Sequence, residues 1–272
     1  MDRIKSCLLT LLMISSSLFS WSTEDFSYDK DWPYQDLWIN GDIIFKGCGP
    51  DCPSRYEALR PLLNTFKRPF SVLEIGANNG YFCFRIANDY DATCVMIDGT
   101  DRLKKICNAN SSLNRIIYLQ KFVNSNDLAK LAQTEHFDLV LCFHVLHHVD
   151  WQPFFAALLK LGDYVVVETP PVNDGFVSLV PVIPEIAEYL LGLPEGIQIG
   201  SFVRQRPEIK DHMILFNPHT SFDYTKIPGI SLATFYAFNG VYPTLPRKSN
   251  PGKWHVTGEG LILKPSGYTR ND

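Results

Sequence analysis

A short apolar run leads into a glycine-containing turn and then into a helical pattern: Val72-Leu73-Glu74-Ile75-Gly76-Ala77-Asn78-Asn79-Gly80-Tyr81-Phe82. We expect a buried strand that ends near Ile75 and a helix that begins near Tyr81. Gly76 lets the backbone turn sharply without a Cβ clash, and Gly80 allows a ligand or a helix to approach closely. In an open α/β sheet, ligands bind beyond the carboxyl ends of the strands, which is where this turn lies.

Strand-like and helix-like patterns alternate on both sides of the turn. Short apolar runs predict strands at 71–75, 93–97, 115–119, 137–143 and 164–167, and helical spacing predicts helices at 81–88, 101–108, 127–133 and 152–161. The strands are apolar on both faces, which is typical of a mostly parallel sheet with helices on both faces. Residues 197–203 and 213–216 are expected to form antiparallel closing strands. The sequence therefore predicts the α/β class, with a doubly wound sheet and a C-terminal cap.

Composition divides the chain into four segments, of which residues 1–22 are the first. Residues 23–54 are aromatic, acidic and rich in turn residues, so we expect an arm or a lid there. Residues 55–220 carry the alternation of strands and helices and form the predicted core domain, with a proline-interrupted insertion at 171–196. Residues 221–272 are expected to be a C-terminal extension.

The first 22 residues have the pattern of a targeting segment. Arg3 and Lys5 precede an uncharged, apolar run that serines dilute. A basic start, a short apolar centre and small residues favour a secretory signal peptide. A membrane anchor through residues 6–23 is the second interpretation, and a soluble N-terminal helix is the third.

Charge and cysteine content exclude some classes of protein. The net charge of −4 and the pI of about 6.0 exclude a generally basic nucleic-acid-binding protein. Cysteines in apolar periodic segments are expected to be buried thiols: Cys83, Cys94, Cys107 and Cys142. Cys48 and Cys52 stand in a turn-rich segment, where a local disulfide and two reduced thiols are both open. No second Cys/His pair follows them at ligand spacing, so we predict no metal site.

Two carboxylates flank the turn. Glu74 lies at the end of the first strand and can accept a hydrogen bond from a ligand amine. Asp98 ends the next strand, 22 residues after Gly76, where a carboxylate suits two ribose hydroxyls. A dinucleotide-binding turn has glycines at the positions of Asn78 and Tyr81, and Glu74 would repel a pyrophosphate. A nicotinamide-dependent oxidoreductase is therefore the weaker interpretation.

This turn resembles that of a known enzyme family. Glu74-x-Gly76-x-Asn78-x-Gly80 is similar to the acid-x-Gly-x-Gly-x-Gly signature of class I S-adenosylmethionine-dependent methyltransferases, with Asn78 in place of the middle glycine. Asp98 matches the ribose-binding acid of that family. Phe137-Asp138-Leu139-Val140-Leu141-Cys142-Phe143-His144-Val145-Leu146-His147-His148-Val149 resembles its fourth strand and the loop that follows. The resemblance covers roughly residues 55–220.

The resemblance implies a Rossmann-like fold with S-adenosylmethionine as the cofactor. It implies methyl transfer to an oxygen, nitrogen or carbon nucleophile of a small-molecule or macromolecular substrate that the sequence does not identify. The residues that it implies for cofactor binding are Glu74, Gly76, Asn78, Gly80, Asp98 and Phe143.

Three polar residues are the candidates for catalysis. His144 lies at the end of the fourth strand, nearest the expected methyl donor, and Glu168 ends the fifth strand. His147 belongs to the pair His147-His148, which in such loops also has a purely shaping role. Adjacent residues do not share a helix face, so we do not interpret this pair as a metal site. Neighbouring aromatic residues are expected in the core rather than around a substrate: Tyr81, Phe82, Trp151, Phe154 and Phe155.

The sequence also allows a second interpretation, in which the protein is not an enzyme. The chain is then an exported or anchored binding protein that keeps the methyltransferase fold without catalysis, because residues 1–22 indicate export whereas S-adenosylmethionine is chiefly cytosolic. The presence of both Glu74 and Asp98 argues against a decayed site. The cellular compartment stays open.

Overall fold

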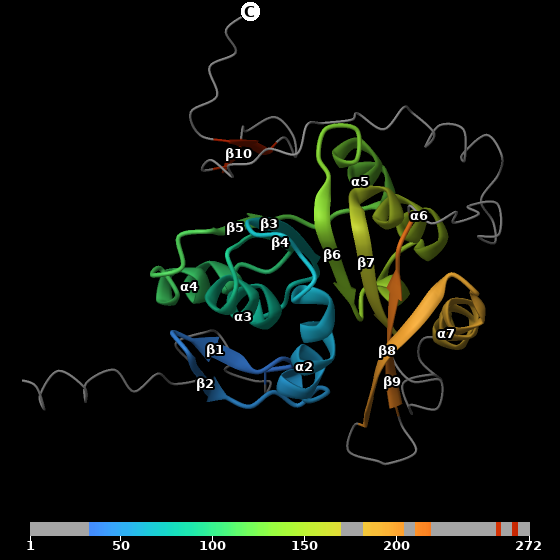
Figure 1. Cartoon of the computed structure of the whole chain (residues 1–272), viewed down its shortest axis with the longest axis horizontal. Coiled ribbons are helices and arrows are strands. Elements are labelled where there is room, and N and C mark those ends of the chain that lie inside the picture. Colours follow the sequence, from blue (N-terminus) through green and yellow to red (C-terminus); the bar gives the residue numbers. More distant parts are fainter. Residues whose placement is uncertain (1–32, 170–181, 204–209, 219–253, 257–262, 266–272) are drawn as a thin grey trace, which may run out of the picture. The chain divides into compact units, whose positions relative to one another are not determined.

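The computed structural model describes residues 33–169, 182–203, 210–218, 254–256 and 263–265. Its main element is a seven-stranded sheet with the strand order β5-β4-β3-β6-β7-β9-β8 (Figure 1). The strands are β3 (Phe70–Ile75), β4 (Ala92–Asp98), β5 (Ile116–Gln120), β6 (Phe137–Phe143), β7 (Gly162–Thr169), β8 (Gly196–Val203) and β9 (Lys210–Phe216). Strands β3 to β7 pair in parallel, whereas β9 pairs antiparallel with β7 and with β8. The predicted mostly parallel sheet with antiparallel closing strands is confirmed.

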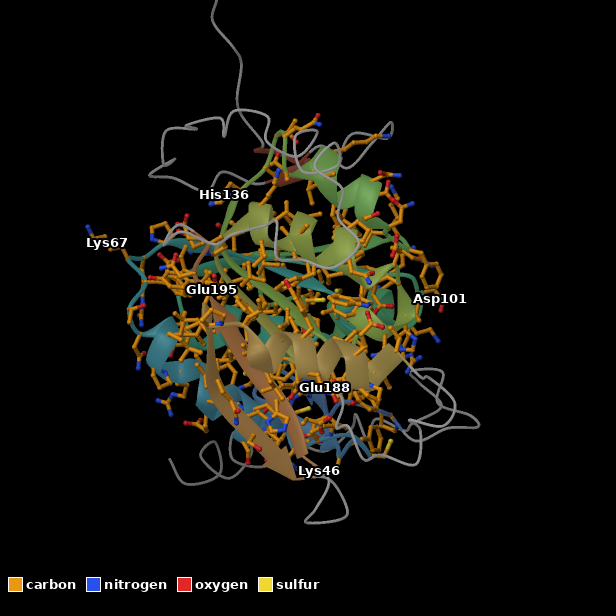
Figure 2. All side chains as sticks on the ribbon, turned by 90° about the vertical axis from the view of Figure 1, so that its right-hand side faces the viewer. Lys46, Lys67, Asp101, His136, Glu188 and Glu195 are labelled. Atoms are coloured by element: carbon orange, nitrogen blue, oxygen red, sulfur yellow. The ribbon has the colours of Figure 1, made fainter. Side chains whose placement is uncertain are left out.

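Helices cover both faces of this sheet (Figure 1). Side chains alternate between the two faces along a strand, so Leu73 and Ile75 lie on one face and Glu74 on the other. Leu73 and Ile75 belong to a core cluster with α5 (Ser125–Leu131), α6 (Trp151–Leu161) and α7 (Val182–Gly192). The helices α2 (Cys52–Leu63), α3 (Tyr81–Asp89) and α4 (Arg102–Ala109) lie along the opposite face. Charged side chains such as Lys67, Asp101 and Glu188 lie on the outside (Figure 2).

The described part of the predicted arm forms a hairpin that packs on the core. Strands β1 (Leu37–Ile39) and β2 (Asp42–Phe45) pair antiparallel. Leu37 and Trp38 are buried, and the Trp38 ring stacks on Phe84 of α3 with ring centroids 6.4 Å apart. The apolar side chains of β1 therefore fasten the segment N-terminal to α2 to the core.

Other predicted segments are described only in part. Within the predicted insertion, residues 182–192 form α7. Within the predicted C-terminal extension, β10 (Trp254–Val256) and β11 (Leu263–Pro265) pair antiparallel. Residues 1–22 lie outside the described residues. Among the helices described, none is both long and apolar enough to cross a bilayer.

The cysteine thiols of the described segments are reduced. Cys83, Cys94 and Cys142 are buried, as predicted, and Cys107 is partly buried. No disulfide joins Cys48 to Cys52, which settles the alternative left open by their spacing. Cys52 is instead buried at the start of α2, where its Sγ accepts a hydrogen bond from the Asp36 N–H at 3.4 Å.

The turn between β3 and α3 has an unusual backbone conformation. Gly76, Asn78 and Gly80 have φ angles of 71°, 53° and 72°, a region that favours glycine and that asparagine tolerates. The Gly76 N–H donates to Ile97 O at 2.8 Å, so the turn is held against the end of β4. A Cβ atom at Gly76 would lie 2.4 Å from Val145 Cγ2. The glycine at this position is therefore required both by conformation and by space.

We expect Gly76→Ala to destabilise the protein. The left-handed conformation alone costs a residue with a side chain about 1–2 kcal/mol, and the overlap with Val145 adds to that cost. Urea denaturation of both proteins measures the difference in free energy of unfolding. Gly192→Ala at the end of α7 is the control, since an added Cβ meets nothing within 4 Å there, and we expect a change within about 0.5 kcal/mol. Equal effects of the two substitutions would contradict this interpretation of the turn.

Candidate active site

The carboxyl end of β4 carries Asp98, whose side chain is held by the protein. Its Oδ2 accepts a hydrogen bond from the Asn78 N–H at 2.8 Å, which ties the acid to the turn after β3. Its Oδ1 accepts bonds from the N–H and the hydroxyl of Thr100, both at 2.9 Å. A carboxylate offers about four acceptor positions. These three bonds fix the orientation of Asp98 and leave Oδ2 a position for a further donor.

The carboxyl end of β3 carries Glu74, whose side chain is incompletely bonded. Glu74 is 1% exposed and its Oε2 accepts a hydrogen bond from the Cys83 N–H at 3.3 Å. Its Oε1 is buried and has no hydrogen-bond partner in the described part of the chain. Burial raises the pKa of Glu74 to about 7, although hydrogen bonding by the Cys83 thiol and by the Cys83 N–H, and the charge of Arg55, act in the opposite direction. A buried acceptor of this kind requires an explanation, and a cationic ligand group would supply one.

A second group of charges is buried beside the first. The Arg55 guanidinium of α2 pairs with the Glu168 carboxylate at the end of β7: Nε donates to Oε1 at 2.9 Å, and Nη2 donates to Oε2. Both side chains are almost completely buried. The guanidinium also lies 4.8 Å from the ring centroid of Phe82 and 5.2 Å from that of Phe143. Burial favours the neutral form of Glu168, but Arg55 and His144 outweigh it and lower the pKa of Glu168.

His144 lies between two carboxylates at the end of β6. Its Nε2 is 3.2 Å from Glu168 Oε2 and 3.5 Å from Asp211 Oδ1, and its side chain is 9% exposed. Its φ angle of 57° is rare for a residue with a side chain, and its N–H donates to Glu168 O at 3.0 Å. Such backbone strain occurs mainly at functional sites. The Nε2 atom of His144 therefore faces the carboxylates of two different strands, β7 and β9.

The structure brings most of the predicted site residues to one end of the sheet. Glu74, Asp98, Phe143 and Glu168 are the last or next-to-last residues of β3, β4, β6 and β7, and His144 follows β6 directly. Phe143 packs its ring edge-on to Phe82, with centroids 4.8 Å apart. The remaining candidate, His147, lies in a short 3-10 helix, Leu146–His148, with its ring centroid 3.9 Å from that of His148.

Sequence reasoning missed Arg55 and Asp211. The partners Arg55 and Glu168 are 113 residues apart, so no local motif marks the pair. Two weak signals existed. Arg55 precedes Tyr56 on the buried side of α2, and Asp211 shares the strand parity of the buried Met213. Each is a charged residue at a core position, where an ionic partner is needed.

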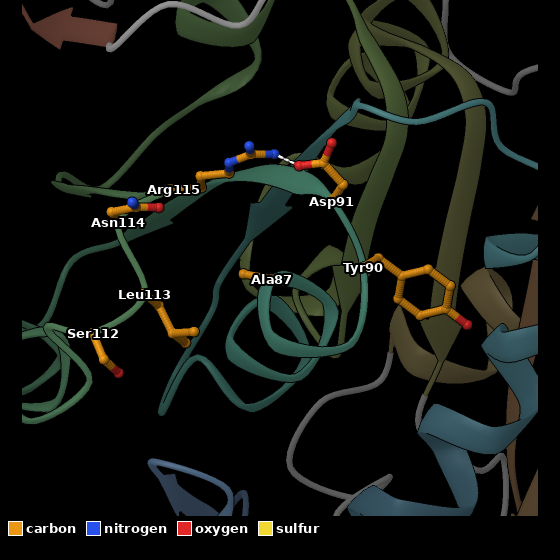
Figure 3. Close-up of a pocket in the computed structure, with 7 residues that line it drawn as sticks. All are labelled: Ala87, Tyr90, Asp91, Ser112, Leu113, Asn114 and Arg115. Atoms are coloured by element: carbon orange, nitrogen blue, oxygen red, sulfur yellow. Dashed lines mark ion pairs between the residues drawn. The ribbon is translucent and has the colours of Figure 1, made fainter.

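A hollow of about 200 Å³ lies at the other end of the sheet, away from these residues (Figure 3). Asp91 and Arg115, which immediately precede β4 and β5, form an ion pair across it. Its lining residues are Ala87, Tyr90, Asp91, Ser112, Leu113, Asn114 and Arg115. Because ligands of open α/β sheets bind at the carboxyl ends of the strands, we do not assign this hollow to the active site.

Comparison with known proteins agrees with this arrangement. A family model described as "Methyltransferase domain" matches residues 53–225, so the chain belongs to that family of methyltransferases. No match was found among curated protein sequences. Among solved structures, the bifunctional kinase-methyltransferase WbdD aligns with a TM-score of 0.60 at 19% identity, over 75% of this chain and 47% of that chain. A 2.2 Å crystal structure of WbdD aligns with a TM-score of 0.59 at 19% identity, over 75% and 48%.

A putative O-methyltransferase from Klebsiella pneumoniae has a TM-score of 0.46 at 16% identity, over 60% of this chain and 79% of that chain. The chain spans about half the length of WbdD. The likeness to WbdD concerns the fold, which is the predicted Rossmann-like sheet.

We expect Glu74→Gln to stabilise the ligand-free protein near neutral pH. The pKa of Glu74 is raised from 4.5 to about 7, so its contribution to stability is full below pH 4.5 and is lost as the pH rises through 7. The neutral amide removes this loss, which gives the variant an advantage of up to about 3 kcal/mol at pH 8. Urea denaturation of both proteins from pH 4.5 to 8 tests this. If the difference in free energy of unfolding between the two proteins does not change with pH, the raised pKa of Glu74 is contradicted.

Breaking the buried ion pair should be costly. Arg55→Met leaves the buried Glu168 carboxylate without its guanidinium partner, and we expect a loss of about 3–5 kcal/mol in free energy of unfolding. The double variant Arg55→Met/Glu168→Gln should recover part of that loss. Arg60→Met, which removes an exposed pair with Glu57 on the same helix, should leave the free energy of unfolding almost unchanged, because solvent screens such a pair. A similar cost for Arg55→Met and Arg60→Met would show that the buried pair has no special weight.

Proposed function

We propose that the chain binds S-adenosylmethionine at the carboxyl ends of β3 and β4 and transfers its methyl group to an acceptor nucleophile. The observation that carries this proposal is the buried Glu74 Oε1 without a hydrogen-bond partner in the described part of the chain. An ammonium group has three N–H donors and a positive charge, so the amino group of the cofactor suits this acceptor.

The other residues of this end also fit the cofactor. Asp98 is oriented by Asn78 and Thr100 and can accept a hydrogen bond from a ribose hydroxyl at Oδ2. A second hydroxyl would need Thr100 Oγ1 to give up its bond to Oδ1. A dinucleotide fits less well, because its pyrophosphate would meet the Asn78 side chain and the charge of Glu74. Phe143, packed below Arg55, would border the opening for methyl transfer.

When bound, S-adenosylmethionine supplies a methyl group already activated by its sulfonium. The protein therefore mainly aligns the acceptor and excludes water. Where the acceptor nucleophile carries a proton, His144 is placed to take it at Nε2, between Glu168 and Asp211. Arg55 keeps Glu168 in its ionised form for this role. His147 remains a candidate from the sequence.

Binding of S-adenosylhomocysteine, the demethylated product, tests the assignment. We expect isothermal titration calorimetry to give a dissociation constant in the micromolar range, which corresponds to a binding free energy of about −8 kcal/mol. Asp98→Ala should weaken binding about 10- to 100-fold, because charge-assisted hydrogen bonds of roughly 1.5–3 kcal/mol are lost. Asp101→Ala, three residues away and exposed, should bind as the wild type does. Circular dichroism spectra of both variants serve as the control for correct folding.

Binding of NADH without a response to S-adenosylhomocysteine or S-adenosylmethionine would overturn the assignment. Turnover of S-adenosylmethionine carrying a labelled methyl group, with candidate acceptors, then separates an enzyme from a binding protein that keeps the fold.

A further inference from the structure

The segment that leads into the β1–β2 hairpin contacts the candidate active site at two points. The carbonyl oxygen of Gln35 accepts a hydrogen bond from Asn79 Nδ2 at 2.7 Å, and Asn79 belongs to the turn after β3. The neighbouring Tyr34 ring lies edge-on to the His144 ring, with centroids 5.7 Å apart. Tyr34 and Gln35 therefore connect the cofactor turn to the end of β6. Both residues lie outside the matched methyltransferase domain, 53–225.

Gln35 is held in position by residues that do not depend on a ligand. The next residue, Asp36, accepts a hydrogen bond from the Gly47 N–H at 2.7 Å and pairs with Lys46 at 3.1 Å. Its own N–H donates to Cys52 Sγ, and Leu37 is fully buried. On the other side, the Gly49 N–H donates to Tyr34 O at 2.9 Å, so the backbone on both sides of Gln35 is fastened to the protein.

The Gln35 side chain ends in a second unsatisfied acceptor. Gln35 is 3% exposed, and its Oε1 is buried without a hydrogen-bond partner among the residues described. Glu74 Oε1 has the same status, and both residues adjoin the turn from Gly76 to Gly80. Burying an acceptor without a donor is unfavourable, so a donor group of a ligand would relieve this cost at each of the two oxygens. An ammonium group has enough N–H bonds to donate to both.

We propose that Gln35 is a further cofactor-binding residue, whose side-chain oxygen accepts a hydrogen bond from the ammonium group at the amino-acid end of the methyl donor. The inference rests on the proposed function, in which Glu74 binds the same ammonium. Gln35 supplies a neutral acceptor beside the charged one. The segment before β1 therefore contributes to the proposed cofactor site, and the hairpin that follows packs against α3.

Two ligands separate contact from general damage to the site. S-adenosylhomocysteine carries the amino-acid end, whereas 5′-methylthioadenosine shares the adenosine and the thioether but lacks that end. Gln35→Met keeps the length of the side chain and removes the acceptor. We expect calorimetry on the full chain to show a 10- to 100-fold weaker affinity of this variant for S-adenosylhomocysteine and an unchanged affinity for 5′-methylthioadenosine.

Control variants keep the test decisive. Gln35→Asn retains the amide but withdraws its oxygen by one methylene, and should show the same selective loss if Gln35→Met fails to fold. Asp42→Asn on the exposed part of β2 should bind both ligands as the wild type does. Asp98→Ala should weaken both ligands, because the ribose is common to them.

Each other outcome has a distinct meaning. Equal weakening of both ligands by the Gln35 variants would show that Gln35 only shapes the turn, and it would overturn the inference. Unchanged binding of S-adenosylhomocysteine by these variants would also overturn it while leaving the proposed function intact. Failure of the wild type to bind either ligand would overturn the proposed function, and the inference with it.

Discussion

The central strand β3 is hydrogen-bonded on both sides by parallel strands. Its residues 70–75 pair with 92–97 of β4, and 72–75 pair with 139–142 of β6. The chain leaves β3 toward β4 and β5 and later returns on the other side to β6 and β7. Loops that leave neighbouring strands in opposite directions open a crevice at the carboxyl ends. Glu74, Asp98, His144 and Glu168 lie at the carboxyl ends of their strands, so the position of the candidate site follows from the strand order.

Two buried carboxylates at the carboxyl ends of β3 and β7 have opposite pKa shifts. Burial acts on both in the same direction, but only Glu168 has a paired guanidinium, so the pKa of Glu168 is lowered and that of Glu74 is raised to about 7. The charges around Glu168 are matched within the protein, by Arg55 and His144. The acceptor capacity around Glu74 is not matched. Groups whose environments push their pKa values apart have different roles, and the unmatched acceptor is the one to which we assign the cationic group of the proposed ligand.

The sequence predicted the fold well because its signals are local. Strands that are apolar on both faces, with glycines and acids at their ends, placed β6 at its observed bounds and β3, β4 and β5 within one residue at each end. Strand β9 was predicted to start at residue 213 but begins at Lys210, because its first residues are polar and give no apolar signal. They extend the strand through pairing with β8, and His212 also pairs with Thr169 of β7. The candidate site residues that follow the turn motif could be named from the sequence, and their roles stay predictions. Arg55, Asp211 and Gln35 were not, because their roles depend on contacts between distant segments.

Residues 34 and 35, which lead into the β1–β2 hairpin, are held in place by contacts within the protein. Tyr34 and Gln35 are held by Asp36, which bonds to Gly47 and Lys46, and by the apolar side chains of β1. A residue fixed before binding loses little conformational entropy when the ligand arrives, so more of its hydrogen-bond energy contributes to affinity. The cost is carried by the ligand-free protein, which buries acceptors without donors at Gln35 and Glu74. In the proposed function, acceptors that are fixed before binding lower the stability of the ligand-free state and favour a ligand whose positive group can donate several hydrogen bonds.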